Sequence, residues 1–277
     1  MGGKNEKIRL DKLLVERRLV ESRERAKRLI MAGMVMVDGV VVDKPGKEVG
    51  SSAEIRLKEK EKYVSRGGYK IESVWRRFRF DVKGKVACDI GASTGGFTNF
   101  LLQMGAKRVY AVDVGRGQLH WKLRNDERVV VLEKFNARYL TEKDLGGKVD
   151  LVTCDVSFIS VLKILPSIKR VLRCGGEYLV LVKPQFEAPK HVVKKGVVRD
   201  PEVHVKVLEK VVKFLSAHRF SISGVAFSEI RGPKGNIEFF VYGHSSEGLE
   251  SGELDLEILK HEVEAAHEFF RRVKDEK

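Results

Sequence analysis

From residue 70 onward the chain alternates short apolar runs with segments of helical period, and this alternation limits the possible folds more than any other feature. Such an order is typical of a mostly parallel, doubly wound sheet with helices on both faces. We expect helices between the first six strands, antiparallel pairing of the last two across the short "SEIRGPKGN" connection, and a final helix over 254–273. The predicted strands cover residues 86–90, 108–112, 129–132, 151–155, 178–182, 222–227 and 237–241.

The first of these strands runs into the stretch "CDIGASTGGFTNF", which carries glycine at positions 91, 95 and 96. In an open α/β sheet, ligands bind beyond the carboxyl ends of the strands, and a glycine-rich first turn lets a ligand approach the backbone closely. The spacing differs from the dinucleotide fingerprint, and no P-loop lysine follows. Asp113 ends the next strand, where a carboxylate can accept both hydroxyls of a ribose. The pattern therefore favours adenosine without a pyrophosphate.

Charged residues end several of the apolar strands. Asp155 follows the fourth strand, Lys183 the fifth, and Glu238 opens the last, while Lys70 precedes the sheet. Because such residues are out of place in a core, we expect these four side chains to converge at the ligand-binding edge. Cys154, a candidate nucleophile for transfer to a pyrimidine ring carbon, points to the face opposite Asp155 and is interpreted as a buried structural thiol.

The N-terminal segment has a different texture. The net charge of the chain is +14, and residues 1–80 hold 21 Lys and Arg against 12 Asp and Glu. Apolar residues at helical spacing predict two short helices, the second capped by Ser22 and ending at Gly33. The run "MVMVDGVVV" predicts a hairpin around Asp38-Gly39. A basic helix pair joined to a small hairpin suits binding to RNA phosphates.

These patterns predict a small α+β domain over 1–60, a charged linker over 61–68 and an α/β domain over 69–277. The three cysteines and seven histidines have no metal-ligand spacing, so we expect no metal. No apolar run approaches the ~20 residues that span a bilayer. We therefore expect a cytoplasmic protein that does not engage a membrane.

The N-terminal runs "RLDKLL" and "SRERAKRLIMAGMVMVDG" resemble the S4 RNA-binding domain. This resemblance implies that the helix and turn formed by the second of these runs face RNA. The residues it assigns to RNA contact are Arg9, Arg23, Lys27 and Arg28.

The glycine turn, Asp113 and the run "DVSF" together resemble a Rossmann-like class I methyltransferase that uses S-adenosyl-L-methionine. The resemblance implies a cofactor site in which Asp113 holds the ribose, Asn136 lies near the adenine and Asp155 lies close by. The residues expected around the methionine part are Gly91, Ala92, Ser93, Gly95, Gly96 and Phe97.

The order Lys70, Asp155, Lys183, Glu238 matches the tetrad of FtsJ-related ribose 2'-O-methyltransferases. With "SRGGYK", "DIGASTGGFT", "CDVSFIS" and "VKPQFE" in place, nearly the whole chain resembles the TlyA family, also called haemolysin A. That resemblance implies methyl transfer to cytidine ribose in 16S or 23S ribosomal RNA, free or in ribosomal subunits. A lysine is normally protonated at neutral pH, so two roles stay open for Lys183: a base, or a cation that orients the hydroxyl.

Two other functions are compatible with parts of the sequence. The haemolysin name carried by relatives would make the chain a membrane-active protein. The basic N-terminal segment alone would serve an RNA-binding ribosome assembly factor without chemistry. Binding of S-adenosylmethionine and methyl transfer to ribosomal subunits would separate an enzyme from both.

Overall fold

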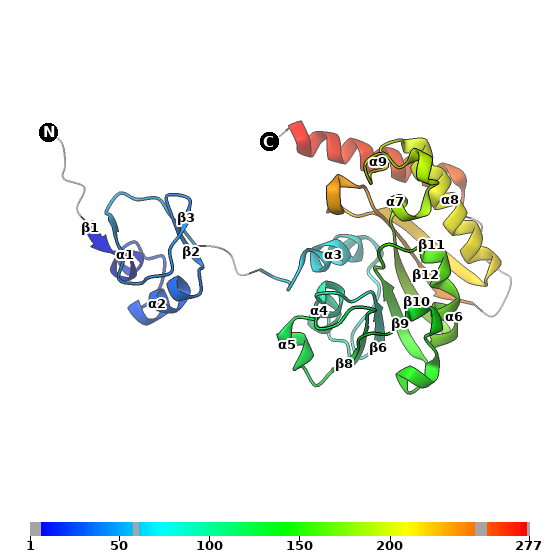
Figure 1. Cartoon of the computed structure of the whole chain (residues 1–277), viewed down its shortest axis with the longest axis horizontal. Coiled ribbons are helices and arrows are strands. Elements are labelled where there is room, and N and C mark those ends of the chain that lie inside the picture. The colour runs from blue at the N-terminus through cyan, green and yellow to red at the C-terminus, as the bar shows by residue number, and fades with distance from the viewer. Residues whose placement is uncertain (1–6, 58–60, 247–253, 276–277) are drawn as a thin grey trace. The chain divides into compact units, whose positions relative to one another are not determined.

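The computed structural model describes residues 7–57, 61–246 and 254–275. The chain divides into two compact units, Met1–Lys62 and Tyr63–Lys277, and each is described by itself (Figure 1).

Over its described residues, the first unit contains two short helices and five short strands. In chain order these are β1 (Lys7–Arg9), α1 (Leu10–Glu16), α2 (Arg23–Met31), β2 (Val35–Val37), β3 (Val40–Val41), β4 (Glu48–Gly50) and β5 (Ile55–Leu57).

Local sequence explains most of this unit, and the predicted helices and hairpin are confirmed. The Ser22 hydroxyl accepts a hydrogen bond from the Arg25 N–H at 3.2 Å and caps α2. Strands β2 and β3 pair antiparallel around Asp38 and Gly39, which both have positive φ, as a two-residue hairpin turn of this kind requires. Leu10, Leu14 and Ile30 of the two helices are fully buried in one small core.

The larger unit is built on a seven-stranded sheet. Its strands are β6 (Val86–Ile90), β7 (Arg108–Val112), β8 (Val129–Leu132), β9 (Val149–Cys154), β10 (Leu172–Val182), β11 (Phe220–Phe227) and β12 (Phe239–Ser245).

The order across the sheet is β11-β12-β10-β9-β6-β7-β8. The five strands from β6 to β10 run parallel, and β12 lies antiparallel to both β10 and β11. The predicted mostly parallel seven-stranded sheet, with its last two strands paired antiparallel, is therefore confirmed. All five parallel strands end at the same edge.

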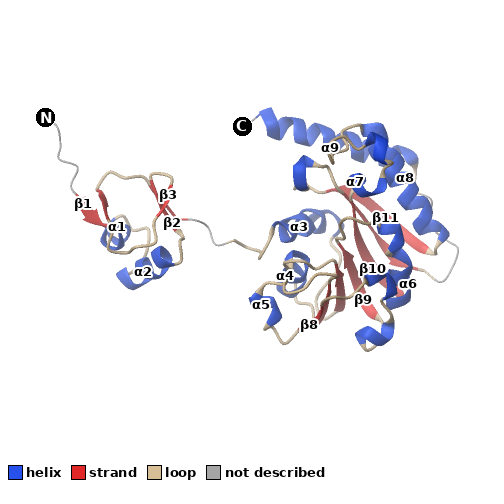
Figure 2. Cartoon of the chain, in the orientation of Figure 1, coloured by secondary structure: helices blue, strands red, loops and turns tan. Residues whose placement is uncertain are grey.

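Helices cover both faces of this sheet (Figure 2). On one face, α3, α4 and α5 pack on a core that includes Ile71, Phe100 and Leu123. On the other face, α6, α8 and α9 pack on a second core that includes Ile168, Leu208 and Val263. The helices are α3 (Arg66–Phe78), α4 (Gly96–Gln103), α5 (Trp121–Arg124), α6 (Leu165–Val171), α7 (Pro184–Glu187), α8 (Pro201–Ala217) and α9 (Leu256–Asp275).

One predicted helix is wrong. Between β8 and β9 the described chain forms two short 3-10 turns, Ala137–Tyr139 and Glu142–Leu145. Asn136 caps the first turn, a capping box of Thr141 and Asp144 starts the second, and Gly146 ends it in the left-handed region. Polar residues that bond to the nearby backbone favour such turns over a continuous helix.

Residues 63–68 of the expected linker are folded onto the larger unit. Tyr63 is buried, and the Val64 N–H donates to the Asn99 side chain at 3.1 Å. A Cβ on Gly68 would lie 2.1 Å from the Tyr63 ring, so only glycine fits against this ring. The charge pattern of the segment gave no sign of this tertiary packing.

Candidate active site

The four charged residues of the expected tetrad meet at the carboxyl edge of the sheet. Lys70 Nζ lies 2.6 Å from Glu238 Oε2, and Lys183 Nζ lies 2.6 Å from Asp155 Oδ1. Lys70, Asp155 and Lys183 line one hollow of about 240 Å³, which we call the active-site hollow. Glu238 lies fully buried behind Lys70. The structure thus brings together residues that are up to 168 positions apart.

Both ion pairs are largely withheld from water. The side chains of Lys70 and Lys183 are only 9% and 8% exposed, and that of Asp155 is 21% exposed. Removing one partner of such a pair leaves an uncompensated buried charge, which is costly. Each ammonium therefore stays where its carboxylate holds it.

Two further polar residues, neither of which was predicted from the sequence, support the tetrad. Lys183 Nζ donates to the Ser157 hydroxyl at 2.8 Å. The Gln185 amide lies 3.4 Å from Glu238 Oε1. Their positions in the sequence could have indicated them, because Ser157 is two residues beyond Asp155 and Gln185 is two residues beyond Lys183.

The glycines of the first turn serve packing within the protein as well as access for a ligand. Gly91 has φ +82°, and a Cβ there would lie 2.6 Å from the Asp155 carbonyl oxygen. A Cβ on Gly95 would collide with Leu123, and one on Gly96 would meet Ser65 and Gly68. Gly91 and Gly96 line the active-site hollow together with Ala92, Ser93 and Phe97, and Gly95 lines no described hollow at this edge.

A buried carboxylate, Asp89, anchors the same turn. It accepts hydrogen bonds from the Thr98 N–H at 2.9 Å, the Thr98 hydroxyl at 2.7 Å and the Thr153 hydroxyl at 3.0 Å. Burial raises the pKa of Asp89 to about 6, although these hydrogen bonds oppose the shift. Because Thr98 lies in the first turn of α4 and Thr153 in β9, Asp89 joins the start of that helix to the neighbouring strand.

A second pocket, of about 440 Å³, adjoins the active-site hollow and shares Gly91, Ser93, Asp155 and Ser157 with it. Asp113 and Asn136 also line it. The Asp113 carboxylate accepts hydrogen bonds from the Ser93 N–H at 2.8 Å and the Gly115 N–H at 2.7 Å. A carboxylate has about four acceptor positions, so these two bonds orient Asp113 and leave capacity for a ligand.

Cys154 is fully buried in β9. Burial raises the pKa of its thiol well above the usual range. A thiol must ionise to act as a nucleophile, so the expected structural role of Cys154 is supported and transfer to a ring carbon loses its only candidate from the sequence.

In the first unit, the residues expected to contact RNA differ in their surroundings. Arg9 and Arg23 both pair with the buried Asp11 carboxylate, at 3.1 and 2.9 Å. Lys27 and Arg28, on α2, have no ion pair within the described ranges 7–57, 61–246 and 254–275. Asp11 therefore fixes two of the arginines, while the other two cations stay available.

Known protein families match the two units of the chain separately. The profile of the S4 domain matches residues 8–55, and that of the FtsJ-like methyltransferases matches residues 63–245. The chain belongs to the FtsJ-like methyltransferase family. The observed sheet and helices are accordingly the Rossmann-like methyltransferase fold, preceded by an S4 domain.

Members of this family with similar sequences include a candidate rRNA methyltransferase, YqxC, of Bacillus subtilis, 48% identical over 98% of each chain. The 16S/23S rRNA (cytidine-2'-O)-methyltransferase TlyA of Mycobacterium tuberculosis is 42% identical over 85% of this chain and 89% of the relative. A solved structure described as a hemolysin candidate from Streptococcus thermophilus is 43% identical, covers 98% of this chain and all of the other, and has a TM-score of 0.76.

Proposed function

We propose that this protein transfers a methyl group from S-adenosylmethionine to the 2'-hydroxyl of a cytidine ribose in ribosomal RNA. The observation that carries the proposal is the meeting of Lys70, Asp155, Lys183 and Glu238 beside a pocket that contains Asp113. Its relatives named for this activity, and the S4 domain ahead of the family domain, favour RNA as the substrate. Such a substrate implies work in the cytoplasm.

The pocket of about 440 Å³ fits the cofactor in size and chemistry. S-adenosylmethionine would supply a methyl group on a positively charged sulfur. Asp113, already oriented by two backbone N–H groups, would hold the ribose hydroxyls. Asn136 would lie near the adenine, and the turn from Gly91 to Phe97 near the methionine part.

The contacts of Lys183 favour one of its two possible roles. Its ammonium is paired with Asp155 and donates to Ser157. A group held in this way is arranged to present positive charge to the attacking oxygen and to stabilise developing alkoxide charge. We therefore assign Lys183 to orienting the hydroxyl, with Asp155 and Ser157 as the residues that position it. The hydroxyl proton would leave to solvent through the active-site hollow as the oxygen takes up the methyl group.

The surroundings of the pocket suit RNA. Phe158 lines the pocket and is 92% exposed, with φ +64°. An exposed aromatic ring beside a catalytic site can stack on an unpaired base. In the S4 unit, the four residues that would contact phosphates are Arg9, Arg23, Lys27 and Arg28. Asp11 holds the first two, and half of each of these side chains remains exposed.

Two other functions are less well supported. Among the described residues, no helix has the length and apolar character of a membrane span. A non-catalytic RNA-binding protein would not need two buried ion pairs at a ligand pocket, because desolvating charges is unfavourable without a use for them.

The test is transfer of radiolabelled methyl groups from S-adenosylmethionine to ribosomal subunits, with mass mapping of the modified nucleoside. We expect 2'-O-methylcytidine from the unaltered protein. Lys183→Ala and Asp155→Ala should each lower turnover by roughly 10² or more, as expected when one group that stabilises developing charge is lost, with cofactor binding measured separately by calorimetry. Lys107→Ala, an exposed lysine at the opposite edge of the sheet, is the control. Normal turnover by Lys183→Ala would refute the assignment.

A further inference from the structure

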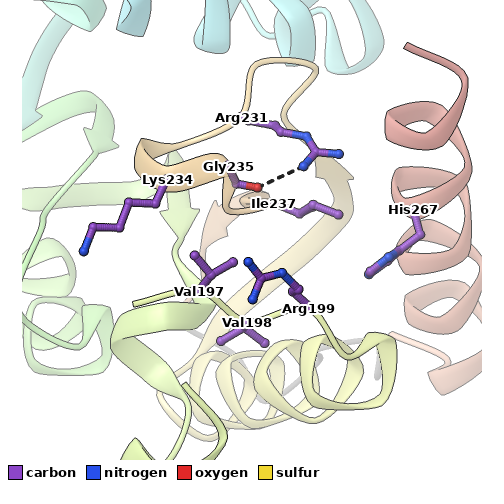
Figure 3. Close-up of a pocket in the computed structure, with 8 residues that line it drawn as sticks. All are labelled: Val197, Val198, Arg199, Arg231, Lys234, Gly235, Ile237 and His267. Carbon is purple, nitrogen blue, oxygen red and sulfur yellow. Dashed lines mark hydrogen bonds between the residues drawn. The ribbon is translucent and has the colours of Figure 1, made fainter. Parts of the chain in front are cut away.

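A third hollow, of about 290 Å³ and lined by basic residues, lies next to the active-site hollow. Three parts of the larger unit form its walls: residues 197–199, the loop 231–237 and His267 of α9 (Figure 3). Arg231 lines both this hollow and the active-site hollow, so the two are neighbours. All the polar side chains that line this hollow are basic: Arg199, Arg231, Lys234 and His267.

The hollow is held open by the protein itself. The buried Asn236 amide donates to the Gly196 carbonyl at 2.9 Å and to the Pro233 carbonyl at 3.0 Å. Its oxygen accepts from the Val198 N–H at 3.2 Å. One side chain therefore joins two walls, and no ligand is needed to shape the site.

The cations lining the hollow are of two kinds. Arg231 is fixed: it donates to the carbonyls of Gly235 and Phe270, and its guanidinium lies 4.4 Å from the centre of the Phe270 ring. Arg199 and Lys234 form no ion pair with the parts of the chain that the structure describes. Figure 3 shows the Arg199 guanidinium turned into the hollow, while the Lys234 ammonium extends to its side, beside Gly196.

Positive charge dominates here at neutral pH even without the histidine. Burial and the nearby Arg271 and Arg231 lower the pKa of His267, and its ring lies 2.9 Å from the His204 ring nitrogen. Among the described residues, the carboxylate that raises the pKa of His267 is that of Asp200, which is exposed and caps α8. The net charge of the lining therefore comes from the two arginines and Lys234.

We propose that this hollow binds a backbone phosphate of the RNA strand that presents its ribose to the active site. The inference rests on the proposed function, because the RNA strand that enters the active site for methyl transfer would bring one of its phosphates to this neighbouring hollow. A guanidinium with free donors matches the oxygens of a phosphate. The exposed Lys194 and Lys195 precede this wall in the sequence and extend the basic surface. The phosphate would fix the register of the strand, since such contacts position RNA without reading its bases.

The test uses the full chain, ribosomal RNA and a series of salt concentrations. We expect Arg199→Ala to lower the slope of log affinity against log salt by about 0.7 to 0.9, the loss of one phosphate contact. At low salt, binding should weaken by roughly tenfold, the order of one charge-assisted hydrogen bond. In methyl transfer, the KM for RNA should rise while the affinity for S-adenosylmethionine stays unchanged. Lys234→Ala should change the slope in the same direction.

Arg108→Ala and Lys107→Ala are matched controls, because both residues are exposed at the start of β7, at the opposite edge of the sheet. If Arg199→Ala and Lys234→Ala leave the salt slope and KM equal to those of the controls, the phosphate site is wrong. If the unaltered protein binds RNA but transfers no methyl group, the proposed function fails, and the salt slopes still decide whether the hollow contacts phosphate.

Discussion

The two units use buried charge in opposite ways. In the first unit, Asp11 is fully buried, but its partners Arg9 and Arg23 are each 50% exposed. In the larger unit, Lys70 and Glu238 are 9% and 0% exposed, so both partners are largely withheld from bulk water. The carboxylate of the first unit serves as an anchor for cations that face outward. The pairs of the larger unit hold charge inside a site, where water screens it little.

This contrast predicts that the loss of one partner has its largest effect on the inner pairs. Lys70→Met should destabilise the larger unit by about 3 to 5 kcal/mol, because Glu238 is left buried without a cation. Denaturant unfolding of the full chain measures the change. The double variant Lys70→Met with Glu238→Gln should recover most of the stability, yet not the methyl transfer. Equal stability of the single and double variants would contradict the claim that an unpaired Glu238 causes the loss, and with it the contrast between the two units.

Asp89 tests a third arrangement, a buried carboxylate whose partners among the described residues are the uncharged Thr98 and Thr153. Because its pKa is raised to about 6, the folded state binds a proton that the unfolded state loses near pH 4. This contribution to stability is full below about pH 4 and is lost as the pH rises to about 6, by at most about 3 kcal/mol. The difference in unfolding free energy between wild type and Asp89→Asn, followed from pH 4 to 7, should show this slope. A flat difference would contradict the burial argument.

Asp11 should behave in the opposite direction. The hydrogen bond from Arg9 leads the interactions that lower the pKa of Asp11 to about 2. Its stabilisation is therefore present above about pH 4 and is lost as the pH falls toward 2, and it amounts to about 2 kcal/mol. Asp11→Asn should raise amide hydrogen exchange in residues 10–37 at neutral pH, with the exposed Asp43→Asn as control. Unchanged exchange would mean that Asp11 does not anchor this unit.

The smallest effect on stability is expected at Lys27 and Arg28, the two α2 cations that have no ion pair among the described residues. Lys27→Ala and Arg28→Ala should leave the unfolding free energy within about 0.5 kcal/mol. Each should reduce the salt slope of RNA binding by about 0.7 to 0.9 if it contacts a phosphate. Salt titrations against Lys107→Ala separate this effect from a general loss of charge. A slope identical to that of the control would remove these two residues from the RNA surface.

The convergence of the tetrad could be predicted because the carboxyl ends of parallel strands meet at one edge, so charged residues after apolar strands are pointers to a site. The cap at Ser22 and the turn at Asp38-Gly39 follow from local sequence and could also be predicted. Tertiary contacts could not be predicted in this way. The packing of Gly96 on Ser65 and Gly68, and the bridge made by Asn236 between two walls, depend on residues that are far apart in the chain. Gly95 and Gly96 were predicted to let a ligand approach the backbone, but neighbouring residues of the protein already exclude a side chain at both positions.

The pairing of Lys70 with Glu238 also has a consequence for biosynthesis. The two residues are 168 positions apart, and Glu238 lies just before the last strand to join the sheet. While the ribosome is still making this chain, Lys70 has no permanent counterion and the tetrad cannot assemble. Under the proposed function, an unfinished copy would therefore lack the site needed to methylate the ribosome that is producing it.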